Sequence, residues 1–197
     1  MGSYYYLASQ LPSLSYGQKP PMLSEAFKDL AKPMLSAEDA KLLDSVSLDP
    51  QPSITANGGL SYAEQAPSSG SDFIDKWREW ERAFRLNLAR QRAVKAKWEG
   101  AVLADPPVVP SDAATAATRA IAAMEAPLEA EILIDKTRWS AIESMQGYDT
   151  FSSNAIFAYL LKLLILERRA SFQTETGFSE YKSLYASILE NAQGVTK

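Results

Sequence analysis

The sequence of 197 residues contains neither cysteine nor histidine. The absence of cysteine excludes disulfides, thiolate metal ligands and a cysteine nucleophile. The absence of histidine removes the commonest general base and metal ligand, and with it a Ser-His-Asp triad. Catalysis by carboxylates, lysine or tyrosine stays open. The composition therefore favours a protein that is not an enzyme and that binds no metal or other cofactor.

A long apolar run and an excess of basic charge are also missing. The longest apolar stretch, residues 155–166, is interrupted by Lys162 and is shorter than the roughly 20 residues that span a bilayer. The start of the chain has no basic segment followed by aliphatic residues, as a secretory signal would. The net charge of −4 argues against a general nucleic-acid binder. We expect a soluble, cytoplasmic protein with no nucleic-acid or small-molecule ligand.

Apolar residues recur with helical spacing, and no segment shows the sustained alternation typical of a strand. A strong helix is expected from Asp72. One face of it carries Phe73, Trp77, Trp80, Phe84 and Leu88. The most apolar helix is expected from Asn154 to about Ser171, and because it is apolar nearly all round it should lie at the centre of the fold.

Serine, proline and glycine mark the expected helix boundaries. A short helix should begin at Ser24 and end at Pro33, and residues 36–39 resemble a capping box that opens a second short helix. Further boundaries are expected at Gly100, Ser111, Pro127, Gly147 and Ser152 or Ser153. A last helix should carry Phe178, Tyr181, Leu184, Tyr185, Ile188 and Leu189.

These elements predict one all-α domain, a bundle of about six to seven helices. Residues 1–48 would form an N-terminal segment with short helices. Residues 49–71, rich in proline, glycine and serine, would form a long loop or linker. Residues 72–197 would form the main helical bundle.

A basic face is expected on the second half of the helix that starts at Asp72. Its members are Arg85, Arg90, Arg92, Lys95 and Lys97, with no acidic residue between them. Such a face either is solvated and complements the helix dipole or binds an acidic protein, anionic lipid headgroups or RNA. Glu79 and Glu81, earlier in the helix, weaken the case for RNA.

Other candidate sites have simpler explanations in packing and solvation. Trp77 and Trp80 could stack on a base or a sugar, but their place on the apolar face favours the core. The pair Glu129 and Glu131 could bind a metal in principle, but it is better explained as a solvated helix face.

Three consecutive tyrosines, Tyr4, Tyr5 and Tyr6, lie near the start of the sequence. Chain ends are normally frayed and polar, whereas each of these rings can bury on the order of 150 Å² while its hydroxyl stays hydrogen-bonded. We therefore expect this segment to dock on the rest of the chain or on a partner, with packing on its own core favoured.

Two segments together resemble a small bacterial family. They are residues 4–14, Tyr-Tyr-Tyr-Leu-Ala-Ser-Gln-Leu-Pro-Ser-Leu, followed by Lys-Pro-Pro-Met at 19–22, and residues 156–169, Ile-Phe-Ala-Tyr-Leu-Leu-Lys-Leu-Leu-Ile-Leu-Glu-Arg-Arg, followed by Gly177. The genes of this family typically lie among the genes for the subunits of V-type (A/V-type) ATP synthases. The pattern is also distantly similar to the C/d family of rotary ATPase components, which form all-α bundles.

The resemblance implies a non-catalytic peripheral subunit of a bacterial V-type ATPase. It would couple the rotor or stalk to the membrane sector in ion or proton transport, on the cytoplasmic side of the inner membrane, with other ATPase subunits as partners. Partner contacts are expected at the tyrosines 4–6 and the basic face. The tyrosines should also pack against the last two helices. The alternative is a helical adaptor or anionic-membrane-surface binding protein unrelated to the ATPase.

Overall fold

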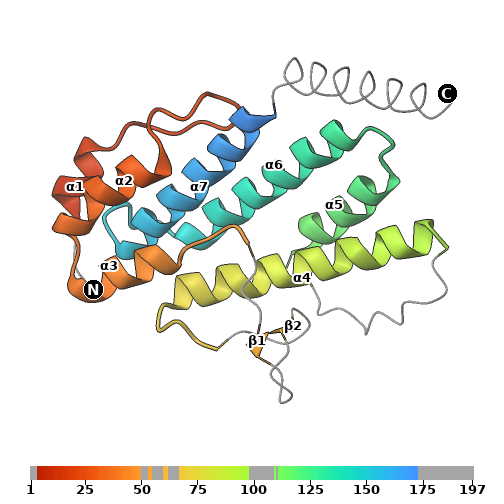
Figure 1. The fold of residues 1–197 in the computed structure, drawn as a ribbon, viewed down its shortest axis with the longest axis horizontal. Helices are drawn as coiled ribbons and strands as arrows, with labels where there is room; N and C mark the ends of the chain where they lie inside the picture. Colours follow the sequence, from red (N-terminus) through yellow and green to blue (C-terminus); the bar gives the residue numbers. More distant parts are fainter. Residues whose placement is uncertain are drawn as a thin grey trace, which may run out of the picture.

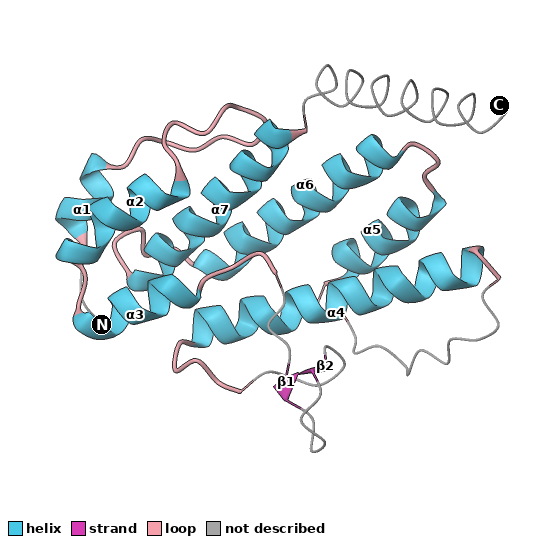
Figure 2. Ribbon diagram, in the orientation of Figure 1, coloured by secondary structure: helices cyan, strands magenta, loops and turns pink. Residues whose placement is uncertain are grey.

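The computed structural model describes residues 4–49, 53–54, 60–61, 67–97, 109 and 111–172. Over these residues the fold class is all-α, as predicted, with one pair of two-residue strands beside the helices (Figures 1 and 2). The elements are α1 (Tyr5–Gln10), α2 (Ser24–Ala31), the 3-10 turn η1 (Lys32–Met34), α3 (Ala37–Ser45), β1 (Ser53–Ile54), β2 (Leu60–Ser61), α4 (Asp72–Lys95), α5 (Asp112–Ala123), α6 (Pro127–Gln146) and α7 (Ser153–Ser171).

One feature of the predicted loop at 49–71 was not expected. β1 and β2 pair in antiparallel fashion, with Ser53 opposite Ser61 and Ile54 opposite Leu60. Two residues a strand are too few for periodicity to show in the sequence, which explains why the pairing was missed.

The helix boundaries follow the capping residues that the sequence offers. The hydroxyls of Ser36, Ser111 and Ser152 each accept a hydrogen bond from the backbone N–H three residues later, which satisfies a donor left unpaired at a helix start. Pro127 occupies the first turn of α6, and Gly147 ends that helix with φ of 76°. The predicted boundary at Gly100 and the predicted last helix lie outside the described residues.

Helix α7 lies at the centre of the described fold, with α2 on one side and α6 on the other (Figure 1). Its side chains at Ile156, Phe157, Leu160 and Leu161 are at most 1% exposed. Helix α6 also packs against α4 and α5, which pack against each other. The prediction of a central α7 is confirmed, because a helix with neighbours on several sides can be apolar nearly all round.

The aromatic residues of α4 belong to the core, as their spacing indicated. The rings of Trp77 and Trp80 stack at 5.6 Å, and those of Trp80 and Phe84 at 4.9 Å. All three side chains are at most 2% exposed. Phe73 extends this face to α7, where its ring lies 6.5 Å from that of Phe157.

The N-terminal segment packs on α7 and on the turn before it. The backbone N–H of Tyr4 donates to the carbonyl of Phe151 at 2.7 Å, and the Tyr159 hydroxyl donates to the carbonyl of Pro12 at 3.0 Å. The backbone N–H and the hydroxyl of Ser24 both donate to the Glu167 carboxylate, at 2.5 and 2.7 Å. The N-terminal segment thus packs on α7 through Pro12 and Ser24, whereas the tyrosines that were expected to pack against the last two helices contact the turn before α7 through Phe151; the predicted last helix lies outside the described residues.

The burial of the Tyr159 hydroxyl predicts a pH-dependent loss of stability in alkali. Burial raises the pKa of Tyr159 from its ordinary value of 10.0 to about 12. Because the folded pKa is the higher one, the contribution of Tyr159 is fully present below pH 10 and is lost as the pH rises towards 12. We expect the free energy of unfolding in urea to fall more steeply over this window in the wild type than in Tyr159→Phe. A tyrosinate absorbance step near pH 12 should also disappear in the variant, and parallel curves would contradict the assignment.

Candidate functional site

Tyr4, the first of the three N-terminal tyrosines, is buried and hydrogen-bonded within the fold. Tyr4 is 8% exposed, and its hydroxyl donates to the carboxylate of Asp39 and accepts from the backbone N–H of Ser36 at 3.3 Å. In a usual capping box the N–H of Ser36 would be bound by a Glu or Gln side chain three residues later. Here the shorter Asp39 stands at that position, and Tyr4 bridges the two groups.

The other two tyrosines are exposed, and Tyr5 lies beside a further aromatic side chain. Tyr5 and Tyr6 are 65% and 70% exposed, and the Tyr5 ring lies 4.8 Å from that of Phe151. Phe151 is itself 36% exposed, and Tyr148, in the same turn between α6 and α7, is fully exposed. We call these four residues the aromatic patch. Tyrosine and phenylalanine are enriched at protein interfaces, so the patch is a candidate contact surface.

The structure separates the first residue of the basic face from the others. Arg85 is half-buried, and its guanidinium donates to Glu81 at 2.5 Å and to the carbonyl of Leu48 at 3.1 Å. Arg90, Arg92 and Lys95 lie in the last turns of α4 and Lys97 lies just beyond it, and all four are exposed. The Lys95 ammonium donates to the carbonyl of Ala123 in α5 at 3.2 Å.

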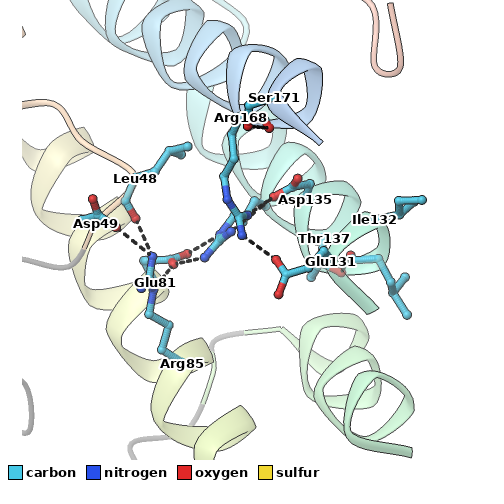
Figure 3. A network of polar contacts seen from close by, with 12 residues as sticks. Leu48, Asp49, Glu81, Arg85, Glu131, Ile132, Asp135, Thr137, Arg168 and Ser171 are labelled. Carbon is cyan, nitrogen blue, oxygen red and sulfur yellow. Dashed lines mark hydrogen bonds and ion pairs between the residues drawn. The ribbon is translucent and has the colours of Figure 1, made fainter. Parts of the chain in front are cut away.

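Arg85 is the edge of a buried ion network that the sequence did not reveal (Figure 3). Arg138 of α6, 5% exposed, donates to both carboxylate oxygens of Glu81 in α4, at 3.1 and 2.6 Å. It also donates to Asp135 at 3.3 Å. From α7, Arg168 donates to Asp135 at 2.7 Å and to Glu131 at 2.5 Å. We call these six residues the ion network; it joins α4, α6 and α7.

The surroundings of Arg138 stabilise its charged guanidinium. Burial alone would lower the pKa of Arg138, but Glu81 and Asp135 outweigh that effect and raise its pKa above the ordinary value. The two-pronged contact with Glu81 matches the fork of a guanidinium to a carboxylate. The ion network is therefore built to hold helices together. Glu131, interpreted as part of a solvated face, belongs to this network instead.

A signal for the network was present in the sequence. Glu81 follows Trp77 by four residues and precedes Phe84 by three, so it lies on the buried face of α4. A charge at such a position requires a buried partner. The sequence alone does not say which arginine supplies it, because Arg138 is 57 residues away.

A groove of about 800 Å³ lies between α4, α5 and α6. Its lining is mostly apolar or small, with the charged side chains of Lys76, Glu79 and Lys136 among the lining residues. A smaller hollow of about 360 Å³ lies beside the ion network, with Phe84 and Arg92 in its lining.

Within the ranges that the structure describes, no group of three or more acidic side chains is placed so that it could hold a metal ion. None of the described helices combines the length and the apolar character needed to cross a membrane.

The fold defines an all-α protein, and one comparison relates it to a known family. Residues 118–191 match the model of a family described as a protein of unknown function (DUF2764). The match begins within α5 and includes α6, α7 and the segment at 156–169 that carries part of the ATPase resemblance. The N-terminal segment at 4–22 lies outside it. No curated protein and no solved structure matches the chain.

Proposed function

We propose that the protein is a non-catalytic peripheral subunit of a bacterial V-type ATPase that couples the rotor or stalk to the membrane sector. The observation that carries this proposal is the packing of the two segments in which the resemblance to an ATPase-linked family lies. Tyr4 binds the turn before α7 through Phe151, and Tyr159 binds the carbonyl of Pro12. The two segments thus contribute to one surface.

The described helices suit a mechanical role. The ion network ties the three longest helices to one another through Arg138 and Arg168, and the stacked aromatic rings of α4 lie in the core. Well-packed interiors have low compressibility and transmit strain. A body of this kind can pass torque or hold a stator in register without any chemical step of its own.

The aromatic patch is the surface that we assign to the ATPase contact. Tyrosine side chains supply large contact areas and often dominate binding energy. In the cells that encode the protein, the tagged wild-type chain should co-purify with the A and B subunits of the ATPase under gentle conditions. Recovery of no ATPase subunit with the wild type would contradict the proposal.

Replacing both exposed tyrosines tests the patch directly. The double variant Tyr5→Ser/Tyr6→Ser should reduce recovery of the A and B subunits by about tenfold or more, since hot-spot residues each contribute about 2 kcal/mol or more. Its melting temperature should stay close to that of the wild type, because both side chains are exposed. Leu128→Ser is a suitable control, because Leu128 is 45% exposed at the opposite end of α6. Equal recovery with the double variant and the wild type would show that the patch is not the contact.

A second candidate function rests on the end of α4. There Val94 is 69% exposed among Arg90, Arg92, Lys95 and Lys97, an arrangement that suits an anionic lipid surface. Flotation with anionic vesicles discriminates between the two functions. Binding by the isolated chain, lost on neutralising Arg92 and Lys95 together, would favour an adaptor at the membrane surface unrelated to the ATPase.

A further inference from the structure

The groove between α4, α5 and α6 is long and narrow. Helix α5 has 12 residues, whereas α4 has 24 and α6 has 20, so α5 covers only part of the space along its two neighbours (Figure 1). The lining residues of α6 extend from Leu133 to Met145, which is about 18 Å of helix. Spread over that length, the volume of about 800 Å³ corresponds to a mean cross-section of about 45 Å².

The surface inside the groove is mostly apolar. Trp80 of α4, Ala114 of α5 and Ala141 of α6 are buried where they line it. Leu133 and Met145 are only partly buried and offer further apolar surface. Sites for small ligands are typically of this size, lie between the helices of bundles and combine an apolar lining with a few polar groups. The groove therefore has the properties of a ligand site.

The hydroxyl groups along α6 do not require a polar ligand. The Thr137 hydroxyl donates to the carbonyl of Leu133 at 2.7 Å, and the Ser144 hydroxyl donates to the carbonyl of Ala141 at 2.8 Å. The third hydroxyl on this side of the groove belongs to Ser140, which is exposed and has access to water. An apolar ligand can therefore lie along α6 without leaving buried donors unpaired.

Four charged side chains line the groove, and three of them already have partners within the described part of the chain. Lys76 binds Asp72 at 2.7 Å, Glu79 binds Arg82 at 2.7 Å, and the Asp75 carboxylate accepts from the backbone N–H of Ser69 at 2.8 Å. The fourth is Lys136, which is exposed and forms no ion pair with any described residue. Lys136 lies one turn from Leu133, near one end of the groove, and is suited to hold an anionic group there.

We propose that the groove binds a free single-chain amphiphile, with its alkyl chain along α6 towards Met145 and its anionic head group at Lys136. A helix is 10–12 Å across and needs a cross-section of about 80 Å² or more, so it could enter this groove only in part, whereas a single alkyl chain fits inside. We expected no small-molecule ligand from the sequence, because the groove forms only where three helices meet. The proposal concerns the isolated chain and goes beyond the ATPase role, so either can fail without the other.

Titration of the isotope-labelled full chain with hexanoate, octanoate and decanoate, followed by amide NMR, tests the apolar part of the site. The affinity should rise about fourfold for each added CH₂ group, because each further group is buried in the groove. Decanoate should shift the amide signals of the lining residues of α4, α5 and α6. An affinity that does not depend on chain length, or shifts confined to the aromatic patch, would overturn the proposal.

A filled groove provides the matched test. Ala117→Trp places a large ring in the lining, whereas Ala116→Trp places the same ring at an exposed position outside it. Decanoate should bind Ala117→Trp about tenfold more weakly or worse, the loss that corresponds to about two CH₂ groups no longer buried, and Ala116→Trp almost as well as the wild type. If Ala117→Trp does not fold, Ser140→Trp, at an exposed position of the lining, makes the same test. Binding as tight as in the wild type with a filled groove would overturn the proposal.

The head group is tested with two amphiphiles that share one chain length. The wild type should bind decanoate more tightly than decyltrimethylammonium, whose head group is cationic. Lys136→Gln should weaken decanoate binding by about two- to fivefold, as expected for an exposed ion pair, without weakening that of the cation. Lys76→Gln is the matched control, because Lys76 lines the same groove but is bound to Asp72. Tighter binding of the cation by the wild type, or an equal loss for both amphiphiles in Lys136→Gln, would overturn the proposal.

Discussion

Replacement of Arg138 by alanine is expected to lower the free energy of unfolding by about 3–5 kcal/mol. The side chain supplies both hydrogen bonds from α6 to Glu81, which is 1% exposed. After its removal, the ion pairs that remain within the described residues are those of Glu81 with the half-buried Arg85 and of Asp135 with Arg168. The loss comes chiefly from leaving buried charge poorly compensated, and it is a large part of the roughly 5–15 kcal/mol that stabilises a typical domain.

Urea unfolding, monitored by circular dichroism, measures this loss. A double variant separates the cost of an unpaired buried charge from the loss of packing. Arg138→Met/Glu81→Leu removes both charges and keeps apolar volume, so it should be less destabilised than Arg138→Ala alone. Lys76→Ala breaks the exposed ion pair with Asp72 and should cost less than about 1 kcal/mol. If Arg138→Ala cost no more than Lys76→Ala, the ion network would not hold the helices together.

The second large effect is expected from Phe27→Ala, which should cost about 3–5 kcal/mol. Phe27 of α2 is 0% exposed, and its ring lies 4.9 Å from that of Tyr159 in α7. Truncation removes the apolar contact that fastens α2 to the central helix and leaves a cavity there. Because α3 packs against α2 and Tyr4, before α1, binds Asp39 of α3, we call α1, α2 and α3 the N-terminal layer and expect it to loosen before the three long helices.

Thermal unfolding and hydrogen exchange together check this expectation. Amides of α2 should exchange faster in Phe27→Ala, by more than those of α4 and α6. Leu23→Ala is the matched control, since Leu23 precedes the same helix and is 64% exposed; it should leave both readouts nearly unchanged. Uniform acceleration over all helices would show that the N-terminal layer is not a separate unit.

The elements and their order could be predicted because their signals are local. Ser111 and Ser152 cap helices through N–H groups three residues away, and such contacts are visible in the sequence. The central position of α7 could be predicted because its apolar residues surround the helix, and this pattern can be read from one segment of the sequence. The strand pair at 53–54 and 60–61 was missed because two residues a strand carry no periodic signal.

The candidate site was harder to predict because its contacts join distant positions. The distinction between Tyr4, which is buried, and Tyr5 and Tyr6, which are exposed, depends on how α1 meets α3 and the turn before α7. In the same way Arg85 was assigned to the basic face by its helix position, although Glu81, four residues earlier, binds it. Residues of one type that follow one another in sequence form a common surface only when tertiary contacts do not bury some of them and expose the others.

The packing of the N-terminal layer on α7 has a consequence for synthesis on the ribosome. Ser24 and its partner Glu167 are 143 residues apart in sequence, so the N-terminal helices are synthesised well before the surface on which they dock. At about 5–20 residues per second, their apolar side chains wait roughly 7–30 s for that surface. Nascent chains of this protein should therefore be clients of ribosome-associated chaperones until α7 has left the exit tunnel.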